Sequence, residues 1–287
     1  MTMTQSAFSD AFSPLIWFGG KSKMAKNLIN LMPPHGCFVD LFGGAAHVIT
    51  QKAPIQTEVY NDIDGLVLNF LMVVREDKTK FIKAVDSLPY SRKLYETWKE
   101  EPWPEDDFAR AVRWFYLNRS GIAKGNADKK TGWRHAKSPG SSPAPAYYAS
   151  IDRISAFSHR MKKVQLECRD FREIIKIYDG TETLFYVDPP YIGREKYYAG
   201  GFTGQDHHDL ADMLNRVQGK ALVSYYDDPL LEVLYPSVAW QRLVLKGYSQ
   251  RVGAKNPRRT DEVVLMNYEV QNALGEIWGR KGANDNV

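Results

Sequence analysis

Short apolar runs alternate with longer amphipathic stretches over two parts of the chain. Runs of strand type occur at 37–41, 58–60, 164–168, 183–187 and 221–225, and helical patterns at 64–75, 151–161 and 206–217 lie between them. Two further apolar runs, 238–245 and 262–268, predict a closing antiparallel pair. This alternation predicts an α/β protein with an open, doubly wound, mostly parallel sheet and helices on both faces.

Between 77 and 150 the alternation stops. Helical patterns at 78–86 and 106–118 are followed by a polar stretch and by a Ser/Pro-rich segment, 138–145, that we expect to be a loop. We therefore predict a core formed by 15–76 and 151–278, interrupted by a helical insertion at 77–150. Residues 1–14 are expected to be a disordered lead and 279–287 a flexible tail.

Composition places the chain among ordinary globular proteins. Of 287 residues, 44% are hydrophobic and 25% charged, and no apolar run approaches the about 20 residues that a membrane span needs. The two cysteines, Cys37 and Cys168, form no CxxC pair, and no signal-peptide pattern opens the chain. We therefore expect a cytoplasmic protein in a reducing compartment. The histidines lack metal-ligand spacing, so no metal is expected.

Positive charge is concentrated in two segments, although the net charge is only +4. Such clusters suit a polyphosphate partner, with solvated loops as the alternative. The candidate phosphate-binding residues are Arg119, Lys124, Lys129, Lys130, Arg134 and Lys137 in the first segment, and Arg251, Lys255, Arg258 and Arg259 in the second.

Acidic residues follow several of the predicted strands. Asp40, Asp62, Asp170 and Asp188 each stand at the end of such a run. Open parallel sheets bind ligands beyond the carboxyl ends of their strands. The four acids are therefore candidates for one ligand site.

The segment Asp188-Pro189-Pro190-Tyr191 offers the most specific chemistry. Its prolines make a rigid turn without amide donors, so a carboxylate and a proline carbonyl stand side by side as acceptors. Two acceptors match the two N–H donors of an exocyclic amine, and Tyr191 offers a flat face for a base. A structural Pro-Pro turn that caps a buried strand is the alternative.

Two glycine turns are candidates for holding a cofactor. Phe42-Gly43-Gly44 follows the strand at 37–41 and precedes a helix start, and Asp62 lies about 20 residues further on, a spacing that suits a ribose. Trp17 and Lys21 flank a second Gly-Gly turn, which also suits a purely structural role.

In this order, the motifs resemble the Dam-type adenine-N6 DNA methyltransferases. The matching segments are Trp17-Phe18-Gly19-Gly20-Lys21, Val39-Asp40-Leu41-Phe42-Gly43-Gly44, Asn61-Asp62, Asp170-Phe171 and Asp188-Pro189-Pro190-Tyr191, with Phe115-Tyr116-Leu117-Asn118-Arg119-Ser120-Gly121 similar to the family's target-recognition region. The resemblance implies a Rossmann-like methyltransferase core with S-adenosylmethionine as the cofactor and duplex DNA as the partner.

The resemblance also implies a role for each matching residue. Trp17 would line the cofactor site, while Lys21, Asp40, Phe42, Gly43 and Gly44 would hold the methionine part. Asp62 would bind the ribose, Asp170 and Phe171 would bracket the cofactor's adenine, and Asp188, Pro189, Pro190 and Tyr191 would hold the target base. Ala46 stands where the family often has a glycine.

The sequence thus predicts a base-flipping enzyme that methylates N6 of adenine by direct in-line transfer. It would act as a monomer or weak dimer. Two alternatives stay open: methylation of RNA or of the cytosine amine, and a DNA-binding regulator that has lost the chemistry.

Overall fold

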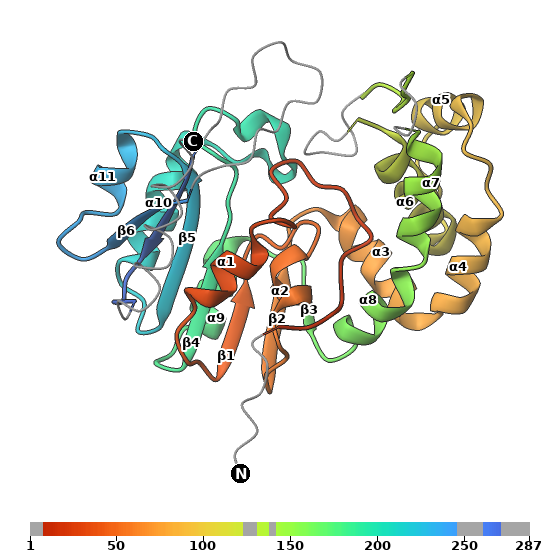
Figure 1. Ribbon diagram of the computed structural model, residues 1–287. Helices are drawn as coiled ribbons and strands as arrows, with labels where there is room; N and C mark the ends of the chain where they lie inside the picture. Colours follow the sequence, from red (N-terminus) through yellow and green to blue (C-terminus); the bar gives the residue numbers. More distant parts are fainter. Residues whose placement is uncertain (1–7, 123–130, 138–141, 246–260, 271–287) are drawn as a thin grey trace, which may run out of the picture.

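The computed structural model describes residues 8–122, 131–137, 142–245 and 261–270 (Figure 1). Its described strands form one seven-stranded sheet in the order β3-β2-β1-β4-β5-β7-β6, in which only β7 runs against its neighbours. The strands are β1 Cys37–Asp40, β2 Thr57–Asn61, β3 Gln165–Glu167, β4 Thr183–Val187, β5 Lys220–Tyr226, β6 Gln241–Leu245 and β7 Glu262–Met266. The predicted doubly wound α/β fold and its antiparallel closing pair are confirmed.

Alternation along the buried strands divides the core into two layers. On β1, Phe38 belongs to one hydrophobic cluster and Val39 to the other; on β4, Tyr186 and Val187 divide in the same way. Successive side chains of a strand point to opposite faces, so a strand buried on both faces supplies both layers. This explains why its sequence reads as a continuous apolar run.

Helices cover both faces of the sheet (Figure 1). One face carries α1 Ala25–Asn30, α2 His47–Gln51, α3 Gly65–Glu76 and α8 Ile154–Met161, and the other carries α9 Phe171–Tyr178, α10 Gly204–Leu214 and α11 Leu230–Leu234. Several of these helices have N-cap side chains that accept hydrogen bonds from backbone N–H groups of the first turn. Asp64 caps α3, Asp170 caps α9, and Thr203 and Asp206 form a capping box on α10.

The segment predicted as an insertion is helical and packs beside α3 and α8 (Figure 1). It contains α4 Lys78–Asp86, α5 Arg92–Glu100, α6 Asp107–Ser120 and α7 Pro143–Ile151. Three of its large, fully buried side chains, Phe81, Trp114 and Tyr147, share one hydrophobic cluster with the sheet-covering helices. The domain boundaries at 77 and 150 stay a prediction, but the described residues of this segment form no hydrophobic core separate from that cluster.

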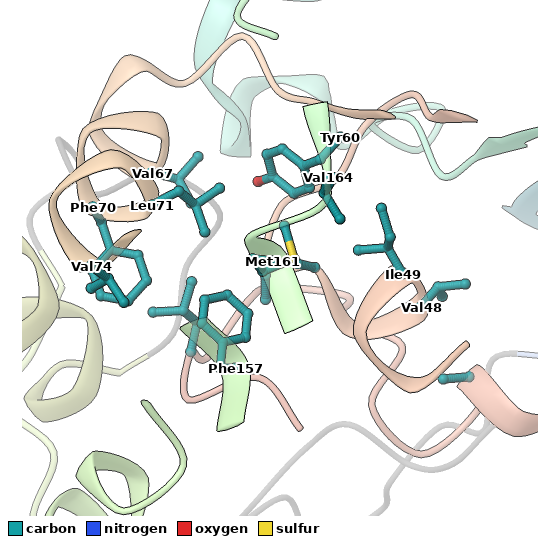
Figure 2. Close-up of a cluster of buried hydrophobic side chains, with 14 of the residues drawn as sticks. Val48, Ile49, Tyr60, Val67, Phe70, Leu71, Val74, Phe157, Met161 and Val164 are labelled. Atoms are coloured by element: carbon teal, nitrogen blue, oxygen red, sulfur yellow. The ribbon is translucent and has the colours of Figure 1, made fainter. Parts of the chain in front are cut away.

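Figure 2 shows how the same cluster continues onto the sheet. Side chains of α3 and α8 meet those of α2 and β2 in one layer; among them Phe70 and Phe157 lie on the insertion side and Ile49 and Tyr60 on the sheet side. The helical segment is therefore packed against the helices that cover the sheet, rather than tethered to them.

Two local expectations are wrong. Residues 8–14 do not belong to a disordered lead: Phe8 forms a β-bridge with Lys52, and Ala11 and Ser13 are buried. The expected loop at 138–145 also includes the first turn of α7, because Pro143 occupies a first-turn position where its missing N–H costs nothing. Residues 1–7 and 279–287 lie outside the described residues.

Candidate active site

The loops at the carboxyl ends of β1 and β4 surround one pocket. Parallel pairing places Asp40 opposite Tyr186, so the Gly43–Gly44 turn after β1 lies next to Asp188 after β4. The pocket is lined by Trp17, Phe18, Gly20, Lys21, Asp40, Phe42, Gly43, Gly44, Ala45, His47, Val48, Tyr186, Asp188 and Tyr198. The pocket thus brings together seven of the thirteen residues that the sequence assigned to the cofactor or the target base: Trp17, Lys21, Asp40, Phe42, Gly43, Gly44 and Asp188.

The Gly43–Gly44 turn has no room for side chains. A Cβ on Gly43 would lie 2.1 Å from the ring of Tyr60, and Gly44 has a φ of +48° with Trp17 packed against it. The Tyr60 hydroxyl donates to the Gly44 carbonyl at 2.6 Å, and the Gly44 N–H donates to Asp62 at 2.7 Å. Both contacts hold the turn against β2, with its backbone at the pocket wall.

Asp62 lies at the end of β2, and its carboxylate is tied to that turn. It also accepts from the Asp64 N–H at 2.9 Å. Burial, reinforced by the charge of Asp64, raises the pKa of Asp62 to about 7. The carboxylate does not line the pocket itself, but supports the loop that does.

Ala46 adopts an unusual backbone conformation at the start of α2. With a φ of 57° it is the one non-glycine residue with positive φ in the described part of the chain. A glycine at this position, which the resemblance implies, would adopt the left-handed region without the strain that a Cβ adds.

Lys21 lines the pocket and is paired with other residues of the site. Its ammonium donates to both oxygens of Asp188, at 2.8 Å each, and to the Tyr191 hydroxyl at 2.6 Å. Burial alone would lower the pKa of Lys21, but the charges of Asp188 and Glu262 outweigh it and raise the pKa above its usual value. In this structure Lys21 is therefore paired with the Asp188 carboxylate.

The Asp188 carboxylate is largely shielded from solvent. Its side chain is 19% exposed. Burial raises its pKa to about 6, with Lys21 lowering the pKa and the nearby charge of Glu262 raising it. At neutral pH it is ionised and able to accept two hydrogen bonds.

Tyr191 does not present the open face expected of it. The ring is 3% exposed and packs edge-on against Tyr226, with centroids 4.3 Å apart. Its hydroxyl points into the carboxylate cluster and contacts Asp188 and Glu262. Pro189 and Pro190 behind it are buried.

Asp170 and Phe171 lie beside the pocket rather than on its wall. Asp170 caps α9 and pairs with Arg172 at 3.0 Å. Phe171 packs with Phe42 and Phe202, with ring centroids 5.8 and 5.9 Å apart. Since Phe42 does line the pocket, this aromatic cluster extends away from it along the sheet edge. Their bracketing of an adenine ring stays a prediction.

The segment after Tyr191 covers the pocket from the other side. Two short 3₁₀ turns, Glu195–Tyr197 and Ala199–Gly201, place Tyr197 and Tyr198 against Phe18, with centroids 5.6 and 6.1 Å apart. His207 supports this segment through Glu195, at 3.2 Å, and holds the Tyr225 hydroxyl at 2.8 Å. This is a structural role for a histidine that the sequence left unassigned.

Three of the basic residues can be placed. Arg119, in the last turn of α6, is partly buried and donates to the Ala146 carbonyl; burial and the nearby charges of Arg134 and Arg153 lower its pKa to about 10. Arg134 and Lys137 are exposed. The remaining candidates lie outside the described residues: Lys124, Lys129, Lys130, Arg251, Lys255, Arg258 and Arg259.

Sequence reasoning missed Tyr198, Tyr186 and His47, which line the pocket, and Glu262, which contacts Lys21 and Tyr191. The pKa of His47 is lowered to about 4 by burial and then by Lys21, so its ring is neutral. Glu262 opens β7, whereas the sequence pointed only to acids that end strands. Because β7 runs against its neighbours, its first residue reaches the same sheet edge as their last.

The described residues hold no group of three or more His, Cys, Asp or Glu side chains placed to bind a metal ion. Each helix in the described ranges is too short or too polar to cross a membrane.

Known proteins are similar in sequence to this chain over most of its length. Three DNA-modifying relatives are similar at low identity: the Retron Ec67 DNA adenine methylase of Escherichia coli (25% over 88% of this chain and 90% of that protein), the DNA adenine methylase of Escherichia coli strain K12 (23% over 77% and 83%), and the Type II methyltransferase M.MjaIII of Methanocaldococcus jannaschii (22% over 88% and 98%). The family model for D12 class N6 adenine-specific DNA methyltransferases matches residues 17–247. The chain therefore belongs to this family and is an adenine-specific DNA methyltransferase.

Proposed function

We propose that the protein transfers a methyl group from S-adenosylmethionine to the N6 amine of an adenine that has been flipped out of duplex DNA. One observation carries the proposal: the Gly43–Gly44 turn and the Asp188 carboxylate line the same pocket. A methyl donor held by the turn and an amine held by Asp188 would be neighbours there, and proximity of this kind is the main source of rate in direct transfer.

Unpartnered polar atoms support the fit of the cofactor. Among the described residues, Asp40 Oδ1 and the Tyr186 hydroxyl are buried without a hydrogen-bond partner. Buried polar groups are normally satisfied, so two such atoms at one pocket favour a polar ligand there. Asp40 would accept from the ammonium of the cofactor's methionine part, and the Gly43–Gly44 backbone would hold the same part. Asp62 is half-buried behind that turn and outside the pocket wall, and it would meet the ribose where the cofactor extends past the turn.

The chemistry asked of the protein is modest. The bound cofactor supplies a methyl group activated by a positively charged sulfur. Asp188 and the Pro189 carbonyl would accept the two N–H bonds of the adenine amine, which frees its lone pair from the ring and directs it at the methyl carbon. Methylation of the amine also requires that its nitrogen lose one proton, and the Asp188 carboxylate would be the nearest base to accept it.

Duplex DNA would be held on the side of the insertion. The exposed Arg134 and Lys137 are candidate phosphate contacts. Arg119 is a weaker candidate than the sequence indicated, because its guanidinium is partly buried against α7.

The test is transfer of labelled methyl from S-adenosylmethionine to unmodified duplex DNA, followed by digestion to nucleosides. We expect label in N6-methyldeoxyadenosine, and its loss in Asp188→Ala with cofactor binding retained. Label in a cytosine product, or on RNA alone, would show that the substrate is not adenine in DNA. Full activity of Asp188→Ala would contradict the mechanism.

A further inference from the structure

A second buried carboxylate faces the same lysine and tyrosine as Asp188. Glu262 is 3% exposed. Its Oε1 lies 3.1 Å from the Lys21 ammonium and also accepts hydrogen bonds from the Tyr191 and Ser224 hydroxyls. Three donors from three separate segments therefore converge on one oxygen atom.

The cluster formed by Lys21, Asp188, Tyr191 and Glu262 has more hydrogen-bond acceptors than donors. Asp188 and Glu262 are two carboxylates around a single ammonium, and the Tyr191 hydroxyl has one hydrogen to give to either of them. Both Asp188 oxygens are occupied by Lys21 in this structure. An adenine amine held by Asp188 would therefore compete with Lys21 for the lone pairs of these oxygens.

We propose that Glu262 is a positioning residue that takes over the Lys21 ammonium and the Tyr191 hydroxyl when Asp188 turns to the target amine, while its negative charge keeps Asp188 a strong acceptor. This inference rests on the proposed function. Glu262 needs no movement for the exchange, because Lys21 and Tyr191 already contact it. The Ser224 hydroxyl, fully buried on β5, holds Glu262 in place.

The exchange predicts a specific pH effect. Ionised Glu262 raises the pKa of Asp188 above what burial and Lys21 alone would set. A neutral glutamine at 262 should lower the pKa of Asp188. The acid limb of the pH profile, in which the transfer rate falls as Asp188 becomes protonated, should then move to lower pH. The other groups that face Asp188 stay unchanged in such a variant: Lys21 from the N-terminal turn, Asp40 on β1, Tyr191 after β4, Tyr198 in the covering segment, and Tyr225 and Tyr226 on β5.

Two variants separate charge from contact. Glu262→Gln keeps the shape but removes the charge: the acid limb should move down by about one pH unit and the single-turnover rate should fall on the order of tenfold. Glu262→Asp keeps the charge but withdraws it from Lys21 and Tyr191: the rate should fall while the acid limb stays in place. Glu269→Gln, which removes an exposed carboxylate after β7, is the matched control and should change neither.

The measurements are single-turnover methyl transfer to duplex DNA from pH 5 to 9 and calorimetric cofactor affinity. Cofactor affinity should stay within about twofold in all three variants. A folded Glu262→Gln protein with the wild-type limb and rate would overturn the proposal. If that variant does not fold, a wild-type rate in Glu262→Asp would overturn it as well. A wild-type enzyme that leaves adenine unmethylated would instead overturn the proposed function.

Discussion

Replacing Gly43 by alanine tests whether the Gly43–Gly44 turn is as tightly packed as the structure indicates. The added Cβ would lie 2.1, 2.4 and 2.7 Å from three ring carbons of Tyr60. Ordinary carbon–carbon contact begins at about 3.5 Å, so the turn or the ring must move by more than about 1 Å. The φ of Gly43 lies outside the left-handed region, so the effect is steric rather than conformational.

Neither partner can move freely. Tyr60 is fully buried on β2, and its hydroxyl is tied to the Gly44 carbonyl. Overpacking of a well-packed site costs about 1–3 kcal/mol. We expect the upper end of that range, about 3 kcal/mol of the free energy of unfolding, and a melting temperature roughly 6–10 °C lower. Displacement of the turn should also weaken cofactor binding more than tenfold.

The assay is thermal and urea unfolding together with calorimetric titration of S-adenosylmethionine. Gly65→Ala is the matched control: Gly65 opens α3, a Cβ at this position would have no other atom within 4 Å, and alanine there should be neutral or stabilising by up to about 1 kcal/mol. If Gly43→Ala melts and binds cofactor like Gly65→Ala, the packing argument for the turn is wrong.

Three further outcomes are expected. Ala46→Gly should change the free energy of unfolding by less than about 1 kcal/mol, because relief of the left-handed strain, about 1–2 kcal/mol, is offset by the loss of a buried methyl group and by a more flexible unfolded chain. Ala46→Val should clearly lower the melting temperature, and equal melting temperatures of the two variants would refute this. Arg160→Met should lower the free energy of urea unfolding by about 3–5 kcal/mol, since Arg160 holds buried Glu58 through two hydrogen bonds of 2.6 and 2.8 Å, and the double variant with Glu58→Leu should recover most of the loss. Cofactor affinity should weaken as the pH falls through about 7, where Asp62 gains a proton, and the Asp62→Asn variant should lack that dependence. The raised pKa of Asp62 also affects the free energy of unfolding: the contribution of Asp62 is largest below about pH 4 and is lost as the pH rises through about 7.

Much of the fold followed from local pattern. The strand 183–187 was predicted with the bounds that β4 has, because a strand buried on both faces is a continuous apolar run. Helix α7 was missed because Pro143 and Pro145 look like loop residues, and only their position in the first helical turn makes them compatible with a helix.

The sequence by itself determined the α/β class, because the class depends on local periodicity. It also identified the acids at the ends of β1 and β4 and the family of the protein, because these depend on motifs of adjacent residues. Only the tertiary structure decided which charges meet. Lys21 and Asp188 are 167 residues apart and joined at 2.8 Å, and Glu262 reaches them because β7 runs antiparallel. Contacts between distant segments depend on strand order and direction, which no local pattern contains.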